Sequence, residues 1–125
     1  MLLIIGGAYQ GKLAYAKERF GLGDCDVYTC GDRTDMPGGK KIVDKLDRWI
    51  LALTKADMNV TFEVGKFLLH NQEAVVICTD ISCGIVPVEE YLRRWRESVG
   101  RALAILSSRS DEVIRLFCGI PSRIK

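Results

Sequence analysis

The chain has 125 residues, of which 48% are hydrophobic and 27% are charged. This balance is typical of a folded globular protein and excludes a wholly disordered chain. Eighteen Lys and Arg against sixteen Asp and Glu leave a net charge of +2. That excess is too small to indicate a protein that binds nucleic acid.

The length predicts a single domain, residues 1–125. No apolar run approaches the roughly 18 residues that a membrane span needs. Residues 1–5 are apolar, but no basic region precedes them and two glycines follow, so they predict a buried strand and not a signal peptide. Five cysteines without an export signal indicate reduced thiols. We therefore expect a cytoplasmic protein with no membrane or nucleic-acid partner.

Five short apolar runs predict β-strands: residues 1–5, 26–30, 41–44, 74–79 and 112–118. The first and fourth are apolar on both faces, which is typical of parallel strands covered by helices on both sides. The segments between them have helical periodicity: residues 11–20, a stretch from Leu46 that breaks at 57–59, residues 60–69, and a helix that begins near Pro87 and runs to Leu106. This alternation predicts an α/β fold, a three-layer sandwich with a mainly parallel central sheet of about five strands.

A glycine-rich segment follows the first predicted strand directly. Residues 6–13 read GGAYQGKL, which matches the phosphate-loop pattern G-x-x-x-x-G-K-[ST] at every fixed position except the last. Glycines allow a tight turn whose N–H groups point at a phosphate, and the lysine and the helix start add positive charge. An ordinary strand–helix turn is the alternative, but the flanking strand and helix favour a P-loop NTPase-like sandwich. The candidate nucleotide-binding residues are Gly6, Gly7, Ala8, Tyr9, Gln10, Gly11, Lys12 and Leu13.

Leu13 stands where the phosphate-loop pattern has Ser or Thr. The missing hydroxyl normally ligates Mg²⁺ in P-loop proteins, so the metal has one protein ligand fewer. We therefore expect GTP or ATP as the cofactor and Mg²⁺ binding that is weakened by Leu13.

Asp44 ends the predicted strand at residues 41–44. In a P-loop protein this position holds the carboxylate that binds Mg²⁺ or one of its water ligands. The alternative is that Asp44 only caps the helix that follows it. The local sequence leaves both interpretations open.

The C-terminal half adds an ordered series of segments to the N-terminal motif. The series as a whole is Gly6-Gly7-Ala8, Gly11-Lys12, Ile42-Val43-Asp44, residues 75–80, Gly84-Ile85-Val86-Pro87, residues 94–97, Gly100-Arg101 and Gly119-Ile120-Pro121. With these segments the chain resembles the family of bifunctional adenosylcobinamide kinases and adenosylcobinamide-phosphate guanylyltransferases of cobalamin biosynthesis. The resemblance covers residues 1–30 and 41–125. It implies a P-loop nucleotide-binding fold, a cobinamide-like alcohol as the phosphate acceptor, and self-association as one option.

The chain departs from this family at functional positions. Asp80 and Ile81 replace the family's Asn-Glu pair, which leaves Asp80 as the candidate on the fourth strand to orient a hydroxyl acceptor. The long segment that carries the guanylylated histidine in the family is missing, because only residues 31–41 join the second and third strands. The one histidine, His70, belongs to another part of the chain and is interpreted as a helix-end residue. We therefore expect no guanylyl transfer through a histidine.

Two further patterns have ordinary explanations. Cys25-x₄-Cys30 and Cys78-x₄-Cys83 together offer four thiolates for zinc, but Cys25 and Cys30 lie at opposite ends of a strand about 16 Å long. The arginines of the last helix read as its solvated face. Arg101 is the one that we single out as an anion ligand, because it follows Gly100, where the chain can approach a ligand closely.

Two functional hypotheses follow. The first is a nucleotide-dependent kinase in which Lys12 contacts the β and γ phosphates, Asp44 holds Mg²⁺ and Asp80 orients the acceptor. The second is a catalytically degenerate P-loop domain that acts as a binding or regulatory module. The missing hydroxyl at Leu13 and the lost carboxylate next to Asp80 favour the second hypothesis.

Overall fold

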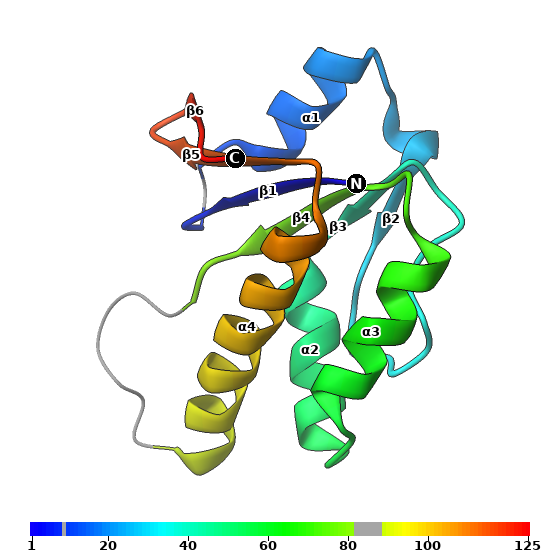
Figure 1. Ribbon diagram of the computed structural model, residues 1–125, viewed down its shortest axis with the longest axis vertical. Coiled ribbons are helices and arrows are strands. Elements are labelled where there is room, and N and C mark those ends of the chain that lie inside the picture. The colour runs from blue at the N-terminus through cyan, green and yellow to red at the C-terminus, as the bar shows by residue number, and fades with distance from the viewer. Residues whose placement is uncertain (9, 82–88) are drawn as a thin grey trace.

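The computed structural model describes residues 1–8, 10–81 and 89–125. Its described residues form a six-stranded sheet in the order β2-β3-β4-β1-β5-β6 (Figure 1). The first five strands in chain order are parallel to their neighbours, and β6 is antiparallel to β5. The strands are β1 (Leu2–Gly6), β2 (Val27–Thr29), β3 (Ile42–Asp44), β4 (Val75–Thr79), β5 (Glu112–Phe117) and β6 (Ile120–Arg123).

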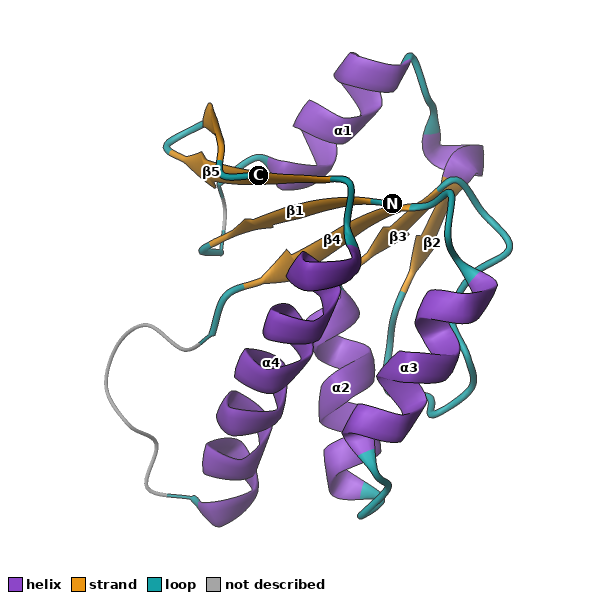
Figure 2. Ribbon diagram, viewed as in Figure 1, coloured by secondary structure: helices purple, strands orange, loops and turns teal. Residues whose placement is uncertain are grey.

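Helices cover both faces of the sheet (Figure 2). On one face lies α1 (Lys12–Phe20), and on the other lie α2 (Leu46–Lys55), α3 (Val60–His70) and α4 (Glu90–Arg109). Each face has its own buried cluster, with Ile4 and Ala16 on the α1 side and Trp49 and Phe67 on the other. The predicted three-layer α/β sandwich with a mainly parallel sheet is confirmed.

The predicted break between the second and third helices is also present, and its cause is local. Asp57 has a left-handed backbone conformation with φ 55°, which ends the helical path. The side chain of Asn59 then accepts a hydrogen bond from the N–H of Phe62 at 3.1 Å and caps α3. Pro87, where we placed the start of the last helix, lies outside the described residues, as does the rest of the Gly84–Pro87 segment.

The strand β6 was not predicted. It pairs with β5 through a two-residue turn in which Cys118 and Gly119 both have positive φ, 52° and 76°. Two positive φ values in succession are typical of the tightest β-hairpin turns. Pro121 has no backbone N–H to donate. It is tolerated in β6 because this strand is at the edge of the sheet and, among the described residues, has no neighbouring strand on its outer side.

The connection between β2 and β3 is fastened to the helices. The indole Nε1–H of Trp49 donates to the carbonyl oxygen of Thr34 at 3.3 Å. Asn71 donates to the carbonyl oxygen of Pro37, also at 3.3 Å. These bonds hold residues 31–41 along the α2–α3 side. In the part of the chain that the structure describes, no helix is both long and apolar enough to cross a membrane.

Candidate functional site

Residues 6–13, called the phosphate loop after the sequence pattern that they resemble, connect the central strand β1 to α1. They therefore lie at the carboxyl edge of the parallel strands, where α/β proteins place their ligands. Gly11 adopts φ 81°, a conformation that glycine reaches without strain, and α1 begins at the next residue. The structure thus gives this motif the strand–loop–helix context that it requires. Tyr9 lies outside the described residues.

A pocket of about 800 Å³ opens beside this loop. Its walls come from the loop and α1, from the segment after β2, from the junction of β3 with α2, from the end of β4, and from α4. The lining residues are Ala8, Gln10, Gly11, Lys12, Leu13, Ala14, Cys30, Gly31, Asp32, Asp44, Lys45, Asp47, Arg48, Thr79, Ile81 and Trp95.

Lys12 is buried in this pocket, with 8% of its surface exposed. Its ammonium donates a hydrogen bond to the carbonyl oxygen of Gly7 at 2.6 Å, so the side chain folds back over its own loop. Burial lowers the pKa of Lys12, while the neighbouring Asp47 and Asp44 oppose this by favouring the charged form. The loop therefore carries a cation that is desolvated and faces two carboxyl groups.

Asp44 ends β3 and is also buried, with 6% exposed. Burial raises the pKa of its carboxyl group, and the nearby Asp47 adds to the rise, whereas a hydrogen bond from the backbone N–H of Lys45 and the charge of Lys12 act against it. Lys45 itself has φ 58°, so the chain turns sharply between β3 and α2 and leaves Asp44 in the pocket wall.

Asp47 was not singled out from the sequence. It lies in the first turn of α2 with 6% of its surface exposed. Its Oδ1 accepts the backbone N–H of Thr79 at the end of β4 at 3.0 Å, and its carbonyl oxygen accepts the indole N–H of Trp95 on α4 at 2.8 Å. The sequence offers one signal for Asp47, which is that it follows Asp44 by three residues and could share a site with it. The signal is weak, because an acidic residue in the first turn of a helix is ordinarily explained by its favourable interaction with the helix dipole.

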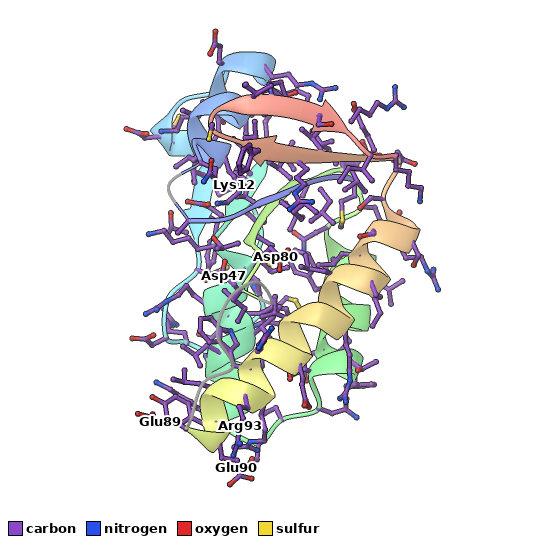
Figure 3. The ribbon with its side chains drawn as sticks, turned by 90° about the vertical axis from the view of Figure 1, so that its left-hand side faces the viewer. Lys12, Asp47, Asp80, Glu89, Glu90 and Arg93 are labelled. Atoms are coloured by element: carbon purple, nitrogen blue, oxygen red, sulfur yellow. The ribbon has the colours of Figure 1, made fainter. Side chains whose placement is uncertain are left out.

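Asp80 follows β4, and its backbone N–H donates to the carbonyl oxygen of Gly6 at 2.8 Å. This bond places Asp80 next to the start of the phosphate loop. Figure 3 shows Asp80 and Asp47 near Lys12, in a different part of the molecule from Glu89, Glu90 and Arg93. The buried thiol of Cys78 has a pKa raised well above its ordinary value, first by burial and then by Asp47 and Asp80. The structure thus brings Lys12 and Asp44 together in one pocket, with Asp47 among them, and places Asp80 beside the pocket residues Thr79 and Ile81.

Arg101 is not brought to this pocket. It is exposed on α4, lies 4.0 Å from Glu97, and lines a separate depression with residues such as Asp57 and Arg94. Gly100 gives no close approach, because it is an interior residue of α4 with nothing within 4 Å of a Cβ placed on it. The anion-binding role of Arg101 stays a prediction that this placement does not support.

His70 is the last residue of α3 and is exposed, with Nδ1 2.8 Å from the carbonyl oxygen of Lys66. Since α3 leads into the start of β4, His70 lies near the amino edge of the strands, opposite the phosphate loop. The interpretation of His70 as a helix-end residue is confirmed.

The cysteines occupy different surroundings. Cys25 is exposed, Cys30 and Cys78 are buried, and Cys83 lies outside the described residues. Burial, with Asp44 and Asp47 nearby, raises the pKa of Cys30 to about 12, so this thiol is neutral at physiological pH. Among the described residues, no three His, Cys, Asp or Glu side chains are arranged to hold a metal by themselves.

The comparison with protein families gives one match. A family model described as cobinamide kinase / cobinamide phosphate guanyltransferase matches residues 24–124. The match includes Asp44, Asp47 and Asp80 and begins after α1, so the phosphate loop is not part of it. No curated protein matches the chain.

Proposed function

The chain belongs to the cobinamide kinase / cobinamide phosphate guanyltransferase family, and we propose that it binds GTP or ATP at the phosphate loop and transfers the terminal phosphoryl group to a cobinamide-like alcohol. The family acts on cobinamide and nucleotide substrates in cobalamin biosynthesis. The observation that carries the proposal is that Lys12 and Asp44 line one pocket beside a strand–loop–helix motif, while Asp80 stands between the pocket residues Thr79 and Ile81 and is bonded to Gly6.

Phosphate binding rests on the loop and its lysine. When a triphosphate enters, the ammonium of Lys12 exchanges its bond to the carbonyl oxygen of Gly7 for bonds to the outer phosphates. Backbone N–H groups of the loop and the amino end of α1 add partial positive charge to the same place. Because Lys12 is desolvated, its interaction with a phosphate oxygen is stronger than it would be in water.

The donor chemistry of the pocket suits Mg²⁺ bound together with a nucleotide. Mg²⁺ takes one or two protein carboxylates along with phosphate oxygens and water, and Asp44 is a buried carboxyl group in the pocket wall. Leu13 supplies no oxygen to such an ion. When bound, Mg²⁺ neutralises negative charge on the phosphates during transfer.

Asp80 is the proposed residue for the acceptor. In the transfer, the acceptor oxygen forms a bond to the terminal phosphorus, the bond from that phosphorus to its bridging oxygen breaks, and the nucleoside diphosphate leaves. The hydroxyl proton passes to the carboxylate of Asp80. The bond from its backbone N–H to Gly6 fixes the position of Asp80 relative to the phosphate loop.

Guanylyl transfer through a histidine has no support in this chain. Its one histidine is His70, the last residue of α3. His70 lies near the amino ends of the strands, whereas Lys12 lies near their carboxyl ends. We therefore propose the kinase reaction without a covalent nucleotide intermediate. A second candidate, a P-loop domain that binds nucleotide without turning it over, is favoured by Leu13.

Calorimetric titration with GTP and with ATP tests the proposal, with a phosphate-transfer assay on a cobinamide-type acceptor. Lys12→Ala removes a charge-assisted contact worth roughly 1.5–3 kcal/mol, so nucleotide affinity should fall about tenfold or more. Lys17→Ala is the matched control, because Lys17 is on the same helix but pairs with Asp24 away from the pocket. Equal affinity in wild type and Lys12→Ala, with both folded, would contradict the P-loop assignment. Binding without transfer would favour the second candidate.

A further inference from the structure

We propose that Asp47 supplies a second carboxylate toward the Mg²⁺ of a bound nucleotide, in place of the hydroxyl that Leu13 lacks. This inference rests on the proposed nucleotide binding at the phosphate loop. It assigns a role to a residue that the phosphate-loop pattern does not include.

The position of Asp47 is the first support. It lines the same pocket as Lys12, Leu13 and Asp44, and it is as buried as Asp44, with 6% exposed. Asp47 is close enough to Asp44 for its charge to add to the raised pKa of the Asp44 carboxyl group, after the larger effect of burial. The bond from the N–H of Thr79 to Oδ1, 3.0 Å long, fixes the orientation of the Asp47 carboxylate.

The charge balance of the buried groups is the second support. Lys12 is the one buried base among the described residues of the pocket, whereas Asp44 and Asp47 are two buried acids. A buried acid next to a polyphosphate is unfavourable unless a cation enters with the phosphate. Mg²⁺ bound by two carboxylates, phosphate oxygens and water meets this need and matches the ion's preferred ligands.

Asp47 also has a structural role, and one variant separates the two. Its Oδ1 fastens α2 to β4, and its carbonyl oxygen accepts a hydrogen bond from Trp95 of α4. Asp47→Asn keeps an amide oxygen for the N–H of Thr79 and leaves the backbone unchanged, so it removes the charge while retaining these bonds. Asp32→Asn is the matched control, because Asp32 lines the same pocket but is exposed and pairs with Arg48 at 3.4 Å.

The experiment compares calorimetric affinities for a non-hydrolysable GTP or ATP analogue in Mg²⁺ and in EDTA. In wild type and Asp32→Asn, Mg²⁺ should tighten binding about tenfold or more. In Asp47→Asn this enhancement should largely disappear, while affinity in EDTA stays the same or improves because a negative charge has been removed. An unchanged enhancement in Asp47→Asn would overturn the inference while leaving nucleotide binding intact. Wild-type protein that binds no analogue under either condition would overturn the proposed function and this inference together.

Leu13→Ser provides a second variant that does not depend on how Asp47→Asn folds. If Asp47 already fills the ligand position, Leu13→Ser alone should change the ratio of analogue affinity in Mg²⁺ to affinity in EDTA by no more than about twofold. In the double variant Leu13→Ser, Asp47→Asn, the added hydroxyl should restore the ratio that Asp47→Asn has lost. A tenfold gain from Leu13→Ser alone would show that the position was vacant and would overturn the inference.

Discussion

The α-carbon of Gly6 faces the carbonyl oxygen of Leu116 so closely that a Cβ atom on Gly6 would lie 2.6 Å from that oxygen. The two residues are register partners in the β1–β5 pair. On its other side, Gly6 accepts the N–H of Asp80 through its carbonyl oxygen. The packing of the two strands therefore requires a glycine at the first position of the phosphate loop.

Gly6→Ala should destabilise the protein. A contact of this kind with backbone cannot be relieved by a rotamer change, so we expect the free energy of unfolding to fall by about 1–3 kcal/mol. Gly100→Ala is the control, because it replaces an interior glycine of α4 with open space around it and should raise stability by about 0.5–1 kcal/mol. Urea unfolding of both variants measures the difference. Equal stability of Gly6→Ala and wild type would show that the strands can separate at this point.

Glu112 should make stability depend on pH. Arg19 donates a hydrogen bond to Glu112 at 2.8 Å, which lowers the pKa of that carboxyl group below its ordinary value. A lowered pKa in the folded state contributes stability above the ordinary pKa, and this contribution is lost as the pH falls through the lowered value. Glu112→Gln should therefore cost about 0.2–1 kcal/mol at pH 7 and less near pH 3, where the carboxyl group of the wild type is more protonated.

Urea unfolding at the two pH values measures this effect of Glu112. Glu97→Gln is the control, since Glu97 is well exposed and lies 4.0 Å from Arg101. A loss of stability in Glu112→Gln that is the same at both pH values would contradict the ion-pair explanation.

The thiols should differ in reactivity. Only the thiolate reacts with alkylating reagents, and Cys30 has a pKa of about 12 and is buried, as is Cys78. At pH 8, iodoacetamide should modify Cys25 and Cys118, which are exposed, while sparing Cys30 and Cys78 in the folded protein. Peptide mapping by mass spectrometry assigns each site, and unfolded protein serves as the control in which all of them react. Rapid modification of Cys30 in the folded state would contradict its protection by burial and by its raised pKa.

No covalent GMP adduct should form. Protein incubated with radiolabelled GTP and Mg²⁺, then denatured in alkali that preserves a nucleotide–histidine bond, should retain no label. His70→Ala should behave like wild type in this assay. Label that remains on wild type and is lost in His70→Ala would show that the exposed end of α3 acts as a nucleophile.

Local patterns were sufficient to predict most of the fold. Strands such as β1 and β4 are apolar on both faces, and the helices between them have their own periodicity, so their order along the chain fixes the α/β class. The strand β6 was missed because all four of its residues are exposed and one is Pro121. A strand that is defined only by its pairing with β5 leaves no hydrophobic pattern in the sequence.

The site was predictable where it follows from strand ends. Asp44 ends β3, Asp80 directly follows β4, and Lys12 begins the helix after the loop that leaves β1, and parallel strands bring those ends to one edge. Asp47 was missed because its burial depends on the contacts of α2 with β4 and α4. The sequence does not show which way a residue of α4 points, so it could not reveal that Arg101 lies outside the pocket of Lys12.

The strand β1 occurs first in the chain but lies between β4 and β5 in the sheet. Leu2 pairs with Val75 and with Glu112, which are 73 and 110 residues further along the chain. Contacts of such long range form late, because the entropy of closing the intervening chain opposes them. During translation the apolar segment of β1 therefore stays without its neighbours until most of the other elements have been synthesised. The same strand that positions the phosphate loop is thus exposed to aggregation, and to capture by chaperones, before folding is complete.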